Sequence, residues 1–187
     1  TLGVTRSVSA TELHPTSDLD MGAPEELLAE HVIRNVGELR EPFLAVVQHS
    51  NVHYPYRVDP AKPTPFEPWS TSKAEDDNRA FWNYYQNAVH QQDLHVAEML
   101  RHVRSGPLGE RTVIVYTSDH GEAFREHGQM GHTFSIFEEE IKVPAFIDAP
   151  PGALTDEEIE NLRAKRDAFV FHVDVAPTLL DLIGVWE

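Results

Sequence analysis

A short run of β-branched and apolar residues, 112–117, constrains the fold of this chain more than any other segment. Its side chains are apolar at successive positions, so neither face of the strand that it predicts suits contact with water. A strand that is buried on both faces needs helices on both sides of its sheet. The run therefore predicts an α/β fold, with a mostly parallel sheet that is flanked by helices.

Helical periodicity appears on either side of this strand. Apolar residues recur at helical spacing over residues 24–39 and again over residues 77–104. A capped helix is predicted over residues 155–166, where Thr155 is the N-cap and a glutamate follows three residues later. A last helix follows Asp174. This alternation of strands and helices supports the α/β class.

Two other apolar runs, 42–48 and 143–147, predict further strands, the first of them buried. Residues 1–23 lack a clear period and are interpreted as a lead-in loop, and the proline-rich residues 57–75 predict an irregular excursion. The length of 187 residues suits one domain or most of one. We expect residues 1–187 to form the carboxyl-terminal portion of a larger domain.

Charge and composition exclude several classes of function. The chain holds 15 Lys and Arg against 31 Asp and Glu, a formal net charge of −16, which excludes nucleic acid as a partner. It has no cysteine, so a disulfide scaffold, a thiolate zinc site and a cysteine nucleophile are excluded as well. No apolar run approaches the roughly 20 residues of a membrane span.

The residues with the clearest chemistry directly follow the best strand. Asp119 and His120 stand in the segment Thr117-Ser-Asp-His-Gly-Glu122, and ligands of α/β sheets bind outside the carboxyl ends of strands. A carboxylate beside an imidazole suits zinc or manganese better than calcium. The alternative is an Asp/Gly turn beside a partly buried histidine, and the sequence leaves it open.

Other histidines are candidates by position. His49 and His53 stand at the end of the strand predicted over residues 42–48, and His132 lies thirteen residues after Asp119, far enough for a loop to return. Each alone is more often a surface or hydrogen-bonded residue than a site residue. Their placement at two strand ends predicts a shared site at one edge of the sheet.

Two groups of potential metal ligands are not assigned to the site. The histidines of the long predicted helix are taken as surface residues; they are His90, His95 and His102. The acidic run Glu138–Glu140 is taken as a solvated charge run rather than a metal cluster.

The order of these motifs resembles the carboxyl-terminal half of the sulfatase family, within the alkaline-phosphatase-like superfamily. The matching segments are 42–44 through 51–56, 85–89 with Asp93, 112–122, Gly131-His132 with Val143-Pro144, and 173–182. The resemblance covers most of residues 42–185 and implies a partial alkaline-phosphatase-like sandwich. It also implies a metal-centred site for sulfate or phosphate ester chemistry.

The resemblance assigns a role to individual residues. Asp119 and His120 match the family's carboxyl-terminal pair of metal ligands, and His53 matches a histidine that contacts the charged group or leaving oxygen of the substrate. His132 matches a position that is usually Lys in arylsulfatases and His in phosphoethanolamine transferases. His49 resembles a second active-site histidine of those transferases. His53 and His132 are thus the implied catalytic residues, and both, with His49, are implied to bind substrate.

Two departures from the arylsulfatase pattern bear on the metal and the substrate. Arylsulfatases generally have Asn in place of His120 and hold calcium, and they have Lys in place of His132. Both departures favour zinc or manganese, with calcium or magnesium still possible. They also shift the expected substrate toward a phosphoester without excluding a sulfate.

The family's nucleophile is a Cys-derived formylglycine, Ser or Thr in its amino-terminal half, where its other acidic metal ligands also lie. We therefore expect this chain to supply half of an active site, to require the amino-terminal half of its parent as a partner, and to be inactive alone. Many membrane-attached bacterial members of the family also have His at the position of His132. The resemblance therefore implies an extracytoplasmic parent, either periplasmic or attached to a membrane.

The leading hypothesis is a metal-dependent hydrolase that acts on anionic sulfate or phosphate esters. One alternative is transfer of phosphoethanolamine or glycerol phosphate to a lipid or glycan. A second is a non-catalytic regulator that keeps the fold. The remaining interpretation is an acidic α/β domain whose histidines are incidental.

Overall fold

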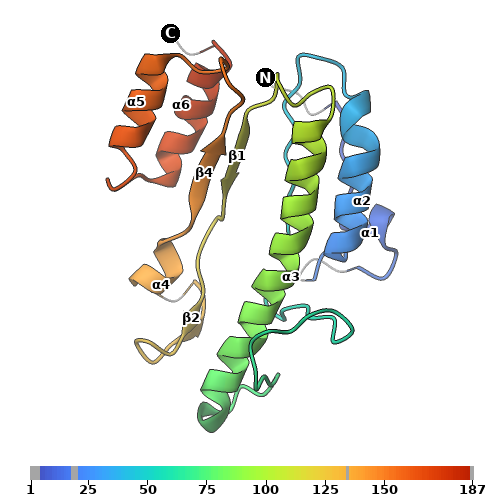
Figure 1. The fold of residues 1–187 in the computed structure, drawn as a ribbon. Helices are drawn as coiled ribbons and strands as arrows, with labels where there is room; N and C mark the ends of the chain where they lie inside the picture. The colour runs from blue at the N-terminus through green and yellow to red at the C-terminus, as the bar shows by residue number, and fades with distance from the viewer. Residues whose placement is uncertain (1–4, 18–20, 134, 186–187) are drawn as a thin grey trace. The chain divides into compact units, whose positions relative to one another are not determined.

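The computed structural model describes residues 5–17, 21–133 and 135–185, which fold as two compact units (Figure 1). The first unit ends at Leu108 and the second begins at Gly109. The first is built from helices and long irregular segments, and both pairs of strands lie in the second.

The first unit is organised around two helices that pack against each other (Figure 1). Helix α2 spans Glu25–Asn35 and helix α3 spans Asn78–Ser105, so the sequence predicted both. Pro24 caps α2, whose first turn carries two glutamates that favour the positive end of the helix dipole. The expected lead-in loop contains one helical turn, α1, at Ala10–Leu13, and short 3₁₀ turns lie at Val36–Glu38 and Glu75–Asp77.

The apolar core of this unit is centred on α3. Phe81 is fully buried, and its ring centroid lies 5.7 Å from that of buried Tyr56. Tyr56 also contacts Tyr85 edge-on at 4.9 Å, a favourable geometry for aromatic pairs. This contact fixes the chain next to the segment that carries His53. Although α3 has 28 residues, no helix of the described residues is both long and apolar enough to span a bilayer.

A row of buried amide side chains on α3 holds the proline-rich segment 57–75. Asn83, Asn87 and Gln91 are spaced four residues apart, so they lie on one face of the helix. Asn87 donates from Nδ2 to the carbonyl of Phe66 at 3.0 Å, and its Oδ1 accepts from the Phe66 N–H at 3.1 Å. Gln91 binds Asp59 in the same two-way manner, at 2.9 Å each way. The segment is irregular, as predicted, but its backbone has fixed partners.

The described residues of the second unit form two antiparallel strand pairs and three helices. Strand β1, Ile114–Thr117, pairs with β4, Ala145–Asp148, in a register that places Tyr116 opposite Phe146. Their rings stack with centroids 5.0 Å apart. The short strands β2, Ala123–Phe124, and β3, Met130–Gly131, form the other pair. The helices are α4 at Glu138–Ile141, α5 at Asp156–Ala164 and α6 at His172–Leu182.

The α/β class and the predicted cap of α5 are confirmed. Thr155 accepts a hydrogen bond from the Glu158 N–H at 3.2 Å, and the Glu158 carboxylate accepts one from the Thr155 N–H. The predicted last helix is α6, and the predicted strands over 112–117 and 143–147 are β1 and β4.

Two expectations about the sheet are corrected. The strand pairs are antiparallel rather than mostly parallel. Residues 42–48 form no strand, and most of their apolar side chains are exposed, with Leu44 at 63% and Val46 at 87%. A strand forms only where its N–H and C=O groups pair with a neighbour, and the described part of the chain provides none for this run.

Replacing Asn87 by Ala tests the amide row. The change removes both hydrogen bonds to Phe66 and leaves two backbone groups without partners, so we expect the free energy of unfolding to fall by roughly 2–4 kcal/mol. Urea unfolding followed by circular dichroism measures it. Arg101→Ala, on an exposed position of the same helix, is the control and should stay within about 0.5 kcal/mol of the unmodified chain. Equal stability of the two variants would contradict the role of Asn87.

Candidate metal and ester site

The predicted metal ligands lie in the segment that leaves β1. Asp119 and His120 follow the end of the strand by two and three residues. The Asp119 side chain is 85% exposed and that of His120 is 34% exposed, so the carboxylate is open to solvent and the imidazole is half-buried. An exposed carboxylate is available for a ligand from outside this segment.

The backbone of this segment is held from several sides. The Ser118 hydroxyl donates to the His120 carbonyl at 2.8 Å, and the Gly121 N–H donates to the Glu140 carbonyl at 2.8 Å. A Cβ at Gly121 would stand 2.1 Å from the Glu139 carbonyl oxygen, far inside van der Waals contact. Only glycine permits this close approach of the two backbones. The contact therefore fixes the positions of the adjacent residues His120 and Glu122.

Hydrogen bonding defines the tautomer of His120. Its Nδ1 lies 2.7 Å from the Gly121 carbonyl oxygen, which can only accept, so Nδ1 carries the proton. Neutral His120 therefore has its lone pair on Nε2, which lies 3.8 Å from Asp119 Oδ2. A metal-binding histidine is commonly oriented in this way by a carbonyl behind it.

The two side chains fit one divalent cation. Ligand bonds of about 2.0–2.2 Å in tetrahedral geometry place neighbouring ligand atoms about 3.4 Å apart, close to the observed 3.8 Å. An imidazole nitrogen with a carboxylate oxygen favours zinc or manganese. The described residues contain no group of three or more side chains that could hold a metal, so these two would form part of a coordination shell.

His132 lies beside this pair. It follows β3 at Gly131, whose φ of +95° suits glycine, and its ring stacks on that of His120 with centroids 4.0 Å apart. Its Nδ1 lies 3.3 Å from the carboxylate of Glu122, a buried side chain. Because a carboxylate only accepts, Nδ1 of His132 is the donor in this contact, which fixes the orientation of the ring.

The structure brings Asp119, His120 and His132 to one cavity of about 260 Å³. Its other lining residues are Thr133, Ser135, Glu140, Ile141 and His172. His127, which the sequence places nearby, is bonded instead to Glu139 at 2.7 Å. Three of the five predicted site residues thus converge within the second unit.

The other two predicted residues, His49 and His53, lie in the first unit, in the turn that follows residue 48. The carboxylate of Glu25, at the start of α2, organises this turn. It binds His49 Nδ1 at 2.7 Å through Oε2 and accepts from the N–H groups of Ser50 and Asn51 at 3.0 and 3.3 Å through Oε1. His53 closes the turn through its N–H, which donates to the Ser50 carbonyl at 3.0 Å.

Glu25 is a buried charge with compensating partners. Its residue surface is 1% exposed. Burial raises the pKa of the carboxyl, but the hydrogen bond and charge of His49, with the two N–H groups, outweigh this effect and bring the pKa below its ordinary value of 4.5. The carboxylate therefore remains ionised and holds His49 in a single orientation.

Sequence reasoning missed three residues around these sites. Glu25 stands 24 positions from His49, so no local signal in the sequence indicates that the two side chains are bonded. His172 donates from Nε2 to the Ser118 carbonyl at 2.6 Å, and its place directly before the segment 173–182 could have pointed to it. Glu140 is buried and accepts from the Ser135 hydroxyl, so the interpretation of Glu138–Glu140 as wholly solvated is wrong at that residue.

The sequence is similar to proteins of one family. A family model described as Sulfatase matches residues 5–185. Arylsulfatase K of Canis lupus familiaris is 32% identical over 114 residues, which cover 61% of this chain and 19% of that protein. The low-salt glycan biosynthesis sulfotransferase Agl7 of Haloferax volcanii is 27% identical over 168 residues, 86% of this chain and 38% of that protein.

The fold is also similar to a solved structure. A sulfatase-like protein of Bacteroides thetaiotaomicron superposes with a TM-score of 0.57 at 19% identity, over 95% of this chain and 46% of that one. This likeness shows a shared fold. The chain thus spans about a fifth of the arylsulfatase K relative and about half of the solved structure.

Replacing Glu25 by Gln tests the buried pair. The amide cannot ion-pair with His49, so we expect the free energy of unfolding at neutral pH to fall by roughly 1.5–3 kcal/mol. Because the pKa of Glu25 is lowered on folding, its contribution is complete above 4.5 and is lost as the pH falls through the lower folded value. Urea unfolding between neutral pH and about pH 3 should show this loss in the unmodified chain and not in the variant.

Glu26→Gln is the matched control, because Glu26 is the next residue and its side chain is 49% exposed. It should retain the acid dependence of the unmodified chain. Parallel pH profiles for Glu25→Gln and the unmodified chain would contradict the assignment.

Proposed function

The chain belongs to the sulfatase family, and on that premise we propose that it supplies part of a metal-dependent active site for hydrolysis of sulfate or phosphate esters. The observation that carries the proposal is the cavity in which Asp119, His120 and His132 meet. A carboxylate and an oriented imidazole to hold a cation, with a second imidazole beside them, form a chemically coherent set for an anionic ester.

Charge makes a cation necessary for this function. With a net charge of −16, the chain repels an anionic substrate unless positive charge is concentrated at the site. A bound divalent ion supplies that charge and polarises an ester oxygen. Asp119 Oδ2 and His120 Nε2 are the atoms that we assign to hold it. The Gly121 carbonyl keeps the second nitrogen of His120 protonated and turned away.

We assign the proton chemistry to the other histidines. His132, whose Nδ1 donates to Glu122, would act in its imidazolium form, in which Nε2–H donates a hydrogen bond to a substrate oxygen or transfers its proton to the leaving oxygen and the ring becomes neutral. His53, in the first unit, is assigned the same role of donating a hydrogen bond or a proton to a substrate oxygen. His49 is fixed by Glu25 and binds the charged group of the substrate.

The proposal includes a division of the site within a longer parent protein. The described residues contribute two metal ligands, whereas a closed zinc site takes four ligands. We propose that the nucleophile and the remaining ligands come from an amino-terminal part of the parent, and that this chain alone does not turn over. The chain aligns with less than half of the length of these relatives, which supports this division.

Transfer to an acceptor is a second candidate function. Agl7, which aligns with 86% of this chain, is named a sulfotransferase of glycan biosynthesis. Transfer and hydrolysis differ only in whether a hydroxyl of an acceptor or water receives the group, so the same residues serve both. Transfer of phosphoethanolamine or glycerol phosphate to a lipid or glycan belongs to this candidate.

The proposal also covers the cellular location of the parent protein, and it has one competing hypothesis. We propose that the parent protein lies outside the cytoplasm, in the periplasm or attached to a membrane. A non-catalytic regulator with this fold is the competing hypothesis. It differs in requiring no metal, which makes metal binding the decisive property.

Metal-dependent thermal shift tests the proposed ligands. Millimolar zinc or manganese should raise the melting temperature of the unmodified chain by a few degrees, because an ion that binds only the folded state stabilises it. Asp119→Ala and His120→Ala should lose most of this shift. His127→Ala is the control, since His127 is bonded to Glu139 and does not line the cavity, and it should keep the full shift.

Equal shifts in the unmodified chain and Asp119→Ala would show that the ligands are wrongly assigned. No shift with either metal would favour the regulator. An aryl sulfate assay of the same sample tests the division of the site, and robust hydrolysis by this chain alone would contradict it.

A further inference from the structure

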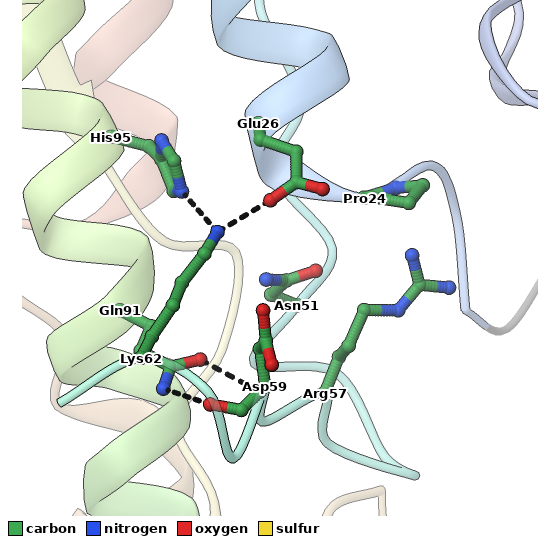
Figure 2. A pocket seen from close by; sticks show the side chains of 8 residues that line it. All are labelled: Pro24, Glu26, Asn51, Arg57, Asp59, Lys62, Gln91 and His95. Carbon is green, nitrogen blue, oxygen red and sulfur yellow. Dashed lines mark hydrogen bonds and ion pairs between the residues drawn. The ribbon is translucent and has the colours of Figure 1, made fainter. Parts of the chain in front are cut away.

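A second cavity, of about 170 Å³, lies wholly within the first unit, between the start of α2, the turn after residue 50, the proline-rich segment and α3 (Figure 2). Its lining residues are Pro24, Glu26, Asn51, Arg57, Asp59, Lys62, Gln91 and His95. The volume has room for several water molecules, hence for one small polar ligand. None of the roles proposed above uses this cavity.

The walls of the cavity are fixed by hydrogen bonds. Gln91 on α3 binds both backbone groups of Asp59, as part of the amide row. Lys62 pairs with the Glu26 carboxylate and donates to His95 Nε2 at 3.3 Å (Figure 2). His95, predicted as an ordinary surface histidine, is thus a wall residue with a side chain only 17% exposed. Such a preformed site needs little ordering to bind a ligand.

One buried group in this wall has no partner. Asn51 is 7% exposed, and no side chain or backbone group of the described residues bonds its Oδ1. A buried acceptor that lacks a hydrogen bond costs roughly 1–3 kcal/mol, so such groups are rare without a water or ligand. Arg57 lies close by in the cavity wall (Figure 2). Its guanidinium contacts the Gly22 carbonyl at 3.5 Å, a long and weak interaction.

Charge in the wall argues for an uncharged ligand. Two cations, Arg57 and Lys62, face two carboxylates, Glu26 and Asp59, and Lys62 is already paired with Glu26. A sulfate, phosphate or carboxylate group would meet both carboxylates at close range. A hydroxyl group both donates and accepts, so it satisfies Asn51 Oδ1 and the guanidinium of Arg57 together.

We propose that this cavity binds one uncharged sugar unit through its hydroxyl groups. Asn51 Oδ1 accepts from one hydroxyl, Arg57 donates to the same or the adjacent hydroxyl, and Pro24 supplies an apolar surface for the C–H face of the ring. Every lining residue belongs to the first unit, and none is a proposed metal ligand. A carbohydrate would therefore bind with or without metal.

Nuclear magnetic resonance titration of the isotopically labelled full chain tests this inference without any metal. The probes are the methyl glycosides of glucose, galactose and N-acetylglucosamine, with sodium sulfate and sodium acetate as anionic comparisons. At least one glycoside should give saturable shifts of the Asn51 and Gln91 side-chain amides. Arg57→Gln should weaken its binding by roughly tenfold, the loss of one hydrogen bond to a charged group.

Arg34→Gln is the matched control, because Arg34 lies on α2 but outside the cavity, and it should bind the glycoside as the unmodified chain does. If Arg57→Gln fails to fold, Arg57→Lys replaces it and should also bind more weakly, because lysine lacks the two-pronged donor. Unchanged affinity in the Arg57 variant would overturn the proposal. So would shifts with sulfate or acetate alone, or no response to any glycoside.

Discussion

The proposed chemistry depends on how the backbone from Ser118 to Glu122 is held. The N–H of Gly121 reaches the Glu140 carbonyl at 2.8 Å, and the position has no room for a Cβ. This approach turns the chain sharply after β1, so that two residues that would alternate in a strand present atoms 3.8 Å apart. The bond from His172 to the Ser118 carbonyl secures the beginning of the turn. Small displacements here would separate the two proposed ligands.

Local patterns predicted the helices well. The ends of α3 follow from the periodicity up to Ser105 and the Gly and Pro beyond it, and the α5 cap follows from Thr155 and Glu158. In both cases the signal lies within a few residues of the element. The strand and the glycines that position Asp119, His120 and His132 are likewise adjacent to them in sequence, so local patterns also indicated that these three residues lie close together, as they do in one cavity.

Contacts between distant residues were not predictable in this way. The bond of Glu25 to His49 joins residues 24 positions apart, and nothing near Glu25 distinguishes it from the exposed Glu26. The amide row on α3 has helical spacing, but its partners lie in a segment without a pattern. Strand pairing failed likewise: the apolar run 42–48 has the composition of a strand, yet its state depends on a neighbour that no local feature specifies.

The two units contribute different physical properties to the proposed function. In the first, a buried carboxylate and a row of amides fix the turn of His49 and His53; in the second, a glycine contact fixes the proposed metal ligands. Anomalous X-ray scattering from crystals of the full chain soaked in zinc or manganese tests this account most directly. We expect an anomalous-difference peak about 2.0–2.3 Å from both Asp119 Oδ2 and His120 Nε2. A metal peak at other histidines, with none at this pair, would contradict the account.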